Sequence, residues 1–491
     1  MALNSRNLNY KAILKLNGII LLIVGAAMIP ALLCAFYYDE PGTATGILKS
    51  MAVIVPLGLI LFVSMRFSKA IFRARDGYIA VATCWITACI FGVLPYLFTG
   101  LTDSFIDALF ESTAGISTTG SSVLDVTLFS KGMLMWKATS NWIGGMGILI
   151  FIISVFPALG INGQVIARLE TPSPVLEKSA IRMTDTAKIL YITYIVFTLL
   201  EFVLLELGSS MSTFDALANS MSCISTGGLF LHPGGLDYYG SNYVDFIICA
   251  FAVIGSVNFL MYFYLIKRNF KAIAKDTELR VFLLVLAAAI VIGFISLWNS
   301  GDMAPGEAFK ISAVQVVSNM TTAGFSYTSI IWPSTCQMLL LILMFTGGCS
   351  ASTSGSLKIV RVIFLFKYIR RGMFRKIHPR AIRTIKLNGR PVPPPVVSAI
   401  AVFILTFFGF FLLSCVILST QGYNFTTTMS TSIAILSNCG LALNDAGLLV
   451  DNFSDFSGFL KVYMCLMMLV GRLELFTMII FFTRAFWDRK K

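Results

Sequence analysis

Charged and titratable side chains are scarce in this 491-residue sequence, which excludes several classes of protein. Only 12% of the residues are charged, whereas soluble domains carry roughly 25%. The only two histidines, His232 and His378, cannot build a histidine-rich metal site or a histidine-based catalytic triad locally. The ten cysteines fall mostly inside apolar segments without paired spacing, so we expect no disulfide framework. No GxGxxG or phosphate-loop sequence is present, so we expect no nucleotide site and no organic cofactor in this chain.

Apolar residues are correspondingly abundant in the sequence. They make up 57% of the chain, and uncharged runs long enough to cross a bilayer recur at 18–37, 50–65, 246–266, 281–298 and 396–418. The sequence therefore predicts an all-α polytopic membrane protein, with the lipid bilayer as its surroundings. No small-residue cleavage site follows the first run, which we interpret as an uncleaved helix.

The net charge of +13 is distributed in a way that argues against nucleic acid as a partner. Lys and Arg gather in the loops at 66–75, 267–275, 358–390 and 484–491. The loops at 39–46 and 299–306 contain none. This alternation is the positive-inside pattern, and it predicts that both termini are cytoplasmic.

One short segment recurs four times along the chain. It reads DALFESTAGISTTGSS at 107–122, DALANSMSCISTGGLF at 215–230, ISAVQVVSNMTTAGFS at 311–326 and TTMSTSIAILSNCGLA at 427–442. The aligned glycines, Gly120, Gly228, Gly324 and Gly440, stand 108, 96 and 116 residues apart. About a dozen residues precede each glycine, too few to span a bilayer, and spanning runs flank each segment.

This order predicts four pseudo-symmetric membrane-pore-membrane repeats around one pore, after two extra N-terminal helices. The predicted boundaries are 1–72 for the N-terminal pair, 73–160, 180–270 and 276–376 for the first three repeats, 377–394 for a cytoplasmic linker, and 395–491 for the fourth repeat.

Residues of this kind suit a cation filter. Non-helical backbone persists at membrane depth only where it is buried or lines a water-filled cavity, and there its carbonyls can replace the hydration shell of an ion. Glycine permits the torsions that this requires, and neutral oxygen ligands favour a monovalent cation over calcium or magnesium. The candidate ligands are Ser117, Thr118, Thr119 and Gly120; Ser225, Thr226, Gly227 and Gly228; Thr321, Thr322, Ala323 and Gly324; and Ser437, Asn438, Cys439 and Gly440. The alternative is that these small residues only allow close helix packing.

The short helices contribute to the same hypothesis. If they enter from outside, their C-terminal ends bring partial negative charge to the pore centre. Asp107 and Asp215, near the N-terminal ends, complement the helix dipoles or act as ordinary caps.

Two further features lie within the later apolar runs. A run of small and hydroxyl residues interrupts the segment after the third candidate filter, which predicts a broken helix beneath it. Its residues are Gly347, Gly348, Cys349, Ser350, Ala351, Ser352, Thr353, Ser354, Gly355 and Ser356.

Arg472 lies inside the last spanning run, where a charge marks an ion pathway or a buried pair. Glu474 is two residues away, on a different helical face, so it is not an automatic partner. Lys137 lies nearer an outer end, and we expect it to snorkel.

These segments resemble the TrkH/KtrB-type potassium transporters over nearly the whole chain from residue 77. The resemblance rests on the four repeated segments, on GGCSASTSGSLK at 347–358 and on VGRLELF at 470–476. The extra N-terminal pair is similar to the TrkH branch. The resemblance implies potassium as the bound ion, uptake across the bacterial inner membrane, a loop at 347–356 that obstructs the pore, and an arginine, here Arg472, that opposes cation passage.

The resemblance also implies a homodimer and a cytosolic, nucleotide-binding, TrkA-like regulatory subunit. The segment 358–390 contains eleven basic residues and no acidic one. It can be a docking surface for that subunit, an ordinary positive-inside loop or a contact with anionic lipid.

Two alternatives to a regulated channel remain at this stage. A symporter that couples potassium to protons or sodium would use buried carboxylates, and Glu201 and Glu206 are the candidates. A membrane enzyme would need a catalytic cluster at membrane depth, and the sequence offers none, so we expect no enzymatic activity.

Overall fold

The computed structural model describes residues 8–65, 74–147, 183–301, 303–327, 329–380, 384–479 and 483. The all-α prediction is confirmed: apart from isolated bridges, the only strands in these residues form two antiparallel pairs. The pairs are β1 (Lys386–Leu387) with β2 (Arg390–Pro391), and β3 (Ala442–Leu443) with β4 (Leu449–Val450). Most of the basic loop at 66–75, the end of the predicted first repeat and the basic residues at 484–491 lie outside the described residues.

Four groups of helices follow one order, namely a long helix, a short helix and a second helix that is short or broken. The first group is α4 (Ala74–Phe91) with α5 (Leu94–Phe98), α6 (Phe105–Ile116) and α7 (Lys131–Gly145). The second is α10 (Met183–Gly208), α11 (Thr213–Ile224), and α12 (Asn242–Ser256) with α13 (Phe259–Ile266), after which α14 (Phe270–Lys275) follows. The third is α15 (Thr277–Asn299), α16 (Pro305–Thr321), α17 (Ser334–Thr346) and α18 (Ile359–Ile377). The fourth is α19 (Pro394–Ser419), α20 (Phe425–Leu436), α21 (Gly458–Arg472) and α22 (Phe476–Ile479).

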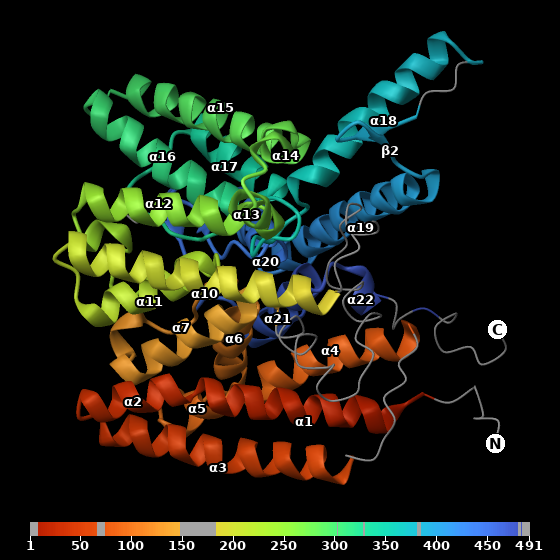
Figure 1. The fold of residues 1–491 in the computed structure, drawn as a ribbon. Helices are drawn as coiled ribbons and strands as arrows, with labels where there is room; N and C mark the ends of the chain where they lie inside the picture. The colour runs from red at the N-terminus through yellow and green to blue at the C-terminus, as the bar shows by residue number, and fades with distance from the viewer. Residues whose placement is uncertain are drawn as a thin grey trace, which may run out of the picture.

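The four groups pack against one another in a closed cycle. The second helix of each group packs against the short helix of the next group, as α7 does on α11, α12 on α16 and α17 on α20. The series returns to its start because α21 packs against α6, and Figure 1 shows these blue and orange helices side by side. Each short helix therefore faces the centre of the molecule.

A pair of helices precedes the first group and lies along one edge of the molecule (Figure 1). It consists of α1 (Tyr10–Ala27), continued by α2 (Ile29–Tyr37), and α3 (Pro41–Ser64). Gly18 and Gly58 lie at the crossing, where a Cβ on either would come within about 3 Å of the other's carbonyl oxygen. The missing side chains thus let α1 and α3 approach closely, as is common between membrane helices.

Within the described residues, six stretches are long and apolar enough to cross a membrane. They are Tyr10–Tyr37, Pro41–Ser64, Asp76–Phe98, Ile189–Gly208, Thr277–Asn299 and Pro394–Ser419. Their outward faces expose large apolar side chains, such as Leu207 (81% exposed), Leu284 (69%) and Leu405 (73%). Apolar surface of this extent fits lipid as the surrounding medium.

The apolar run at 246–266 forms a bent pair of helices and not one continuous helix. The chain bends by 94° between α12 and α13, and the seventh candidate span is this bent pair. Two contacts with the segment at 347–356 occupy the break: Cys349 donates its amide to Ser256 O, and Phe259 donates its amide to Ala351 O. Asn258 then starts α13 by accepting the Leu260 amide on its side chain. Polar groups that a continuous helix would satisfy internally are thus paired with another segment.

The other second helices are also short. They contain 15 residues in α7, 13 in α17 and 15 in α21, fewer than the roughly 20 that a membrane span needs. The chain is non-helical immediately after α17 and α21: Gly347 has φ 65°, and Glu474 and Leu475 have φ 54° and 52°. The interior below the short helices is therefore built from loops and helix ends.

Candidate functional site

The four repeated segments adopt one backbone conformation directly after the short helices. In each, the residue two before the glycine has positive φ, and so does the glycine itself. The first set is Thr118 (57°), Thr226 (53°), Thr322 (56°) and Asn438 (55°), and the second is Gly120 (82°), Gly228 (58°), Gly324 (75°) and Gly440 (79°). Positive φ is costly for a β-branched residue such as threonine. Strain that recurs at corresponding positions suggests a functional constraint.

Each short helix also ends in the same way. The residue between those two donates its amide to the carbonyl oxygen five residues earlier, as in a Schellman turn. The pairs are Thr119 to Ala114, Gly227 to Ser222, Ala323 to Ser318 and Cys439 to Ala434, all at 2.8–2.9 Å. The four helix C-termini, with their partial negative charge, therefore converge on the segments.

The segments form a closed ring. At each of the four glycines, a Cβ atom would come closer than 3 Å to the carbonyl oxygen of the residue before the next repeat's glycine. The pairs are Gly120 with Gly227 O, Gly228 with Ala323 O, Gly324 with Cys439 O, and Gly440 with Thr119 O. The order runs 1, 2, 3, 4 and back to 1, so the backbones surround one axis with no room for side chains at the glycines.

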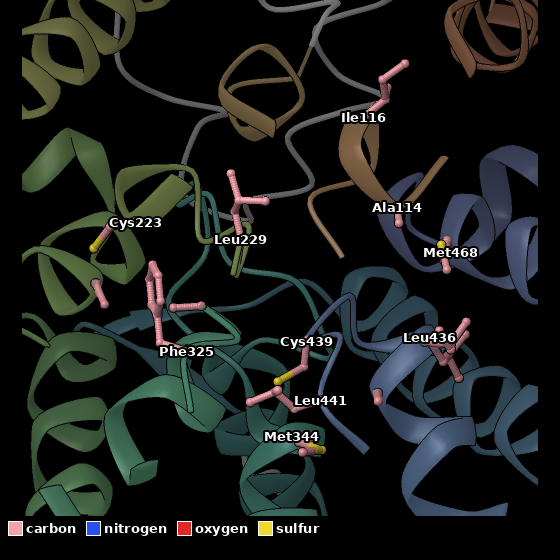
Figure 2. Close-up of a cluster of buried hydrophobic side chains, with 14 of the residues drawn as sticks. Ala114, Ile116, Cys223, Leu229, Phe325, Met344, Leu436, Cys439, Leu441 and Met468 are labelled. Carbon is pink, nitrogen blue, oxygen red and sulfur yellow. The ribbon is translucent and has the colours of Figure 1, made fainter. Parts of the chain in front are cut away.

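Apolar side chains from all four repeats belong to one buried hydrophobic cluster (Figure 2). They include Ile116, Leu229, Phe325 and Leu441, each less than 5% exposed. The ring itself contains backbone carbonyls and hydroxyl groups but no carboxylate. In the described part of the chain, no group of three or more His, Cys, Asp or Glu could hold a metal. Such a set of neutral oxygens suits a weakly hydrated monovalent cation.

The segment Gly347–Ser356, here called the intramembrane loop, lies directly against the short-helix ends. Ser354 Oγ donates to Thr321 O at 2.8 Å, and the Gly355 amide donates to Thr322 Oγ1 at 2.9 Å. Thr353 Oγ1 contacts Ile224 O at 3.0 Å. A Cβ on Gly355 would overlap Ser437 O. The loop therefore touches the ends of the second, third and fourth short helices at once.

Arg472 joins this loop to the first repeat. Its Nη1 donates to Thr353 O at 2.8 Å, and its Nη2 donates to Gly144 O at 2.6 Å and to Gly145 O at 2.7 Å. The acceptors at 144 and 145 are carbonyls of the last turn of α7, where a cation is favourable. The guanidinium thus lies at the level of the loop, below the ring.

Glu474 pairs elsewhere, as its helical position suggested. It lies 3.3 Å from Lys358 Nζ and forms an ion pair with Arg361 Nη2. Both bases lie just after the intramembrane loop, at the start of α18. The two charges of the VGRLELF motif therefore hold the middle of the loop and its far end.

Three glycines that the sequence reasoning did not single out bring the second helices close to the ring. A Cβ on Gly144 would meet Ile116 O, one on Gly255 would meet Ile224 O, and one on Gly471 would meet Leu436 O, all closer than 3 Å. Each carbonyl belongs to the last residue of the short helix in the same repeat. The sequence signal that could have identified them is a glycine near the C-terminal end of each second helix.

The expectation that Lys137 snorkels is wrong. Its side chain is only 5% exposed, and Nζ lies 2.8 Å from Glu111 Oε2, which is fully buried in α6. The other Glu111 oxygen accepts Ser122 Oγ (2.5 Å) and the amides of Val123 (2.7 Å) and Leu124 (3.1 Å). The pair thereby supports the chain just beyond Gly120. The corresponding residues in the other repeats are Asn219, Gln315 and Thr431, which explains why the repeat pattern did not reveal it.

Asp107 and Asp215 lie in the first turns of α6 and α11, as expected for residues that complement the dipoles. They also form ion pairs across the repeat boundaries. Asp107 lies 2.7 Å from Lys461 Nζ of the fourth repeat, and Asp215 lies 3.6 Å from Lys131 Nζ of the first. These pairs add electrostatic contacts to the ring closure.

Residues at and just after the ends of the first and second segments, with residues beyond the fourth, line a cavity of about 170 Å³, enough for several water molecules. It includes Ser122, Phe230, His232 and Asp451. Burial raises the pKa of the Asp451 carboxyl to about 6, although the nearby Lys137 charge opposes the shift. A partly polar cavity with room for water thus adjoins one side of the ring.

Fold and site together define a multi-pass membrane protein built around one central, four-part site. A family model described as "Cation transport protein" (TrkH) matches residues 45–489, and the chain belongs to this family. It is 32% identical to the Trk system potassium uptake protein TrkH of Halomonas elongata over 487 residues, 98% of this chain and 100% of that protein. It is also 32% identical to the protein of the same name from Escherichia coli K12, with the same coverage.

A solved structure has the same fold. The crystal structure of the potassium transporter TrkH from Vibrio parahaemolyticus superposes with a TM-score of 0.87 at 30% identity, covering 98% of this chain and 100% of that one. The relatives are transport proteins, in line with the expectation of a transporter and not an enzyme.

Proposed function

We propose that this chain mediates potassium uptake across the bacterial inner membrane, through one gated pore with both termini in the cytoplasm. The observation that carries the proposal is the closed ring in which each of four glycines abuts a carbonyl oxygen of the next repeat. Carbonyls held in such a ring can replace the hydration shell of an ion without carrying charge. The names of the full-length relatives, potassium uptake proteins of a Trk system, support potassium as the ion.

In this proposal the sixteen candidate ligands form the filter, with the backbone at Gly120, Gly228, Gly324 and Gly440 at its centre. The four helix C-termini stabilise a cation there by their partial charges. Entry needs no chemistry beyond the membrane potential, worth about 2.3 kcal/mol per charge for each 100 mV.

The intramembrane loop and Arg472 form the gate. The loop contacts three short-helix ends, and Arg472 bonds it to α7. A fixed positive charge below the filter raises the energy of a cation that leaves it, because little water is available to screen the charge. Opening requires that the loop and the guanidinium move together.

A cytosolic, nucleotide-binding regulatory subunit supplies that movement, and the protein acts as a homodimer. Support comes from the resemblance and from the basic segment that directly follows the loop. Its helix α18 projects from the body of the molecule (Figure 1) and exposes Phe366, Tyr368 and Met373 together with Arg370, Arg375 and Lys376. Apolar side chains beside positive charge suit a protein partner better than water alone.

The test is potassium and sodium flux into proteoliposomes under an inside-negative potential, for wild type and Arg472→Ala. We expect potassium influx to rise at least about tenfold in the variant and to exceed sodium influx, because the barrier charge is removed while the filter remains. Lys310→Ala serves as a control, since this positive charge is 37% exposed and lies 3.7 Å from Asp245, away from the loop. Equal potassium and sodium entry would contradict the selective filter, and unchanged influx in Arg472→Ala would contradict the gate.

One observation favours a second candidate, a proton-coupled symporter. Glu201 is completely buried in α10, whereas Glu206 is half-buried and accepts the Thr213 hydroxyl. A buried carboxylate can carry a proton through a transport cycle. In a symporter, the reversal potential shifts with the pH gradient and Glu201→Gln abolishes the shift; in a channel it follows the potassium gradient alone.

A further inference from the structure

Glu278, a residue outside both the filter and the proposed gate, holds the intramembrane loop from the side. It lies in the first turn of α15 and is only 6% exposed. Its Oε1 accepts the Ser350 amide at 2.6 Å, and its Oε2 accepts Ser350 Oγ at 2.7 Å. Both carboxylate oxygens are thus satisfied by one residue of the loop. Hydrogen bonds to a charged group are among the stronger ones in proteins.

This arrangement favours the loop position that the structure shows. A buried carboxylate is costly unless its oxygens are hydrogen-bonded. If the loop moved away, Glu278 would lose both partners before water could replace them. The energy of the carboxylate is therefore lowest with Ser350 in place, so the residue biases the loop against displacement.

The same turn of α15 binds a second element, the hairpin formed by β1 and β2. Asn388, at the turn of the hairpin, accepts the Thr277 amide at 2.8 Å and donates to Asp276 Oδ2 at 2.8 Å. Asp276 is the N-cap of α15, and its other oxygen accepts the Leu279 amide. Three consecutive residues, 276–278, therefore hold the hairpin on one side and the loop on the other.

Helix α18 lies between these two contacts along the chain. It begins directly after Lys358, just past the end of the loop, and its Lys367 Nζ donates to Lys386 O of the hairpin at 2.8 Å. Displacement of α18 or the hairpin would pull on the N-cap of α15 and on the loop end together. Helix α18 and the β1–β2 hairpin are in this way connected to the buried intramembrane loop.

We propose that Glu278 is the positioning residue that keeps the intramembrane loop under the filter, and that the hairpin controls it through the first turn of α15. The inference rests on the proposed gate and identifies how it is held and where it is released. A partner that moved the hairpin would release Ser350 without touching the pore.

The experiment compares Glu278→Ala with wild type in proteoliposomes, with Glu307→Ala as a matched control at an exposed position in the first turn of α16. We expect Glu278→Ala to raise potassium influx roughly tenfold, because two charge-assisted hydrogen bonds are lost, without a change in the potassium-to-sodium ratio. Glu278→Gln can still accept the Ser350 amide, so its influx should stay within about threefold of wild type. The control should match wild type.

A second readout follows the loop itself. Cys349 is 1% exposed next to Ser350, and its modification by a water-soluble thiol reagent is measured on its peptide by mass spectrometry. We expect faster modification in Glu278→Ala than in wild type or Glu307→Ala. Should Glu278→Ala not fold, Ser350→Ala removes one of the two bonds and should give a smaller rise in both readouts.

The hairpin is tested with Asn388→Ala alone and with Glu278→Ala. We expect Asn388→Ala to raise influx in the same direction, and the double variant to exceed Glu278→Ala by less than about twofold, since both act on one contact. Effects that multiply would overturn the role of the hairpin. Unchanged influx and Cys349 modification in Glu278→Ala, with increased influx in Arg472→Ala, would overturn the role of Glu278 and leave the gate intact. If neither variant raises influx, the proposed gate itself is wrong.

Discussion

Single residues in this protein are constrained by their neighbours in the adjacent repeat. The four ring glycines illustrate this, because each needs positive φ and also faces a carbonyl oxygen of the next repeat. Substitution of a ring glycine therefore has two separate costs, backbone strain at positive φ and steric overlap with the neighbouring carbonyl. A second glycine in the chain has the first cost without the second. Gly422 has φ 80°, almost equal to the 79° of Gly440, but nothing lies within 4 Å of its Cβ position.

We predict that Gly440→Ala abolishes potassium flux, whereas Gly422→Ala leaves it unchanged. Both substitutions place an alanine at positive φ, at a cost of about 1–2 kcal/mol. Only the first drives a methyl group into Thr119 O of the ring. Flux and thermal unfolding measured on both variants check this; equal flux in the two would contradict a functional ring at this position.

The buried pair of Glu111 and Lys137 is a second constraint at this scale. Glu111→Gln should destabilise the protein by about 3–5 kcal/mol, because it leaves the buried Lys137 ammonium uncompensated. Adding Lys137→Met should recover most of the loss, since an apolar side chain of similar length replaces the orphan charge. The measurement is the free energy of unfolding in detergent.

The control for this pair is Lys310→Met. Lys310 lies 3.7 Å from Asp245 with a side chain that is 37% exposed, and Asp245 keeps its hydrogen bond from Tyr327, so removal of Lys310 should cost at most about 1 kcal/mol. No rescue in the double variant would mean that the buried charges are stabilised by groups other than each other.

At the scale of elements, the interruptions of the second helices are as informative as the helices. The break between α12 and α13 receives the intramembrane loop through Ser256 O and the Phe259 amide. The loop therefore replaces the helical hydrogen bonds that a continuous span would have made. Any change that loosens the start of α13 should also loosen the loop.

We predict that Asn258→Ala lowers stability by about 1 kcal/mol through loss of the α13 N-cap and raises potassium influx severalfold. Asn269→Ala removes the analogous cap of the exposed helix α14 and should leave influx unchanged. Thermal unfolding and flux on the two variants decide the matter. Equal influx in both would show that α13 and the loop are not coupled.

The whole molecule is a closed arrangement of four repeats with an apolar outer surface. The cyclic packing of each second helix on the next short helix brings the ring together, and the long helices α10, α15 and α19 expose apolar side chains outward. Lipid is the medium in which this surface is stable.

This orientation predicts different responses to the same substitution at two exposed leucines. Leu405→Arg, near the middle of α19, should reduce the yield of folded, membrane-inserted protein, since arginine at a span centre costs about 2.5–3.5 kcal/mol. Leu128→Arg, in the short 3-10 helix between the first ring segment and α7, should be tolerated although its exposure is similar, 61% against 73%. Membrane fractionation and size-exclusion profiles of both variants provide the measurement.

Local sequence signals determined the class of protein, the four repeated segments and the interruption at 347–356. These signals are carried by composition, by the length of apolar runs and by glycine at fixed spacing, all of which act within a few turns of one helix. Arg472 was recognisable for the same reason, as a charge inside an apolar run.

Tertiary structure alone decided which residues meet. Three contacting pairs lie far apart in the sequence, and their spacing does not predict a contact. They are Glu111 with Lys137, Asp107 with Lys461, and Glu278 with Ser350, separated by 26, 354 and 72 positions. Their partners are chosen by the cyclic packing of the repeats and by the path of the loop into the broken α12–α13 helix. Hydrogen bonds and ion pairs depend on distances of about 3 Å, which only the assembled ring of repeats defines.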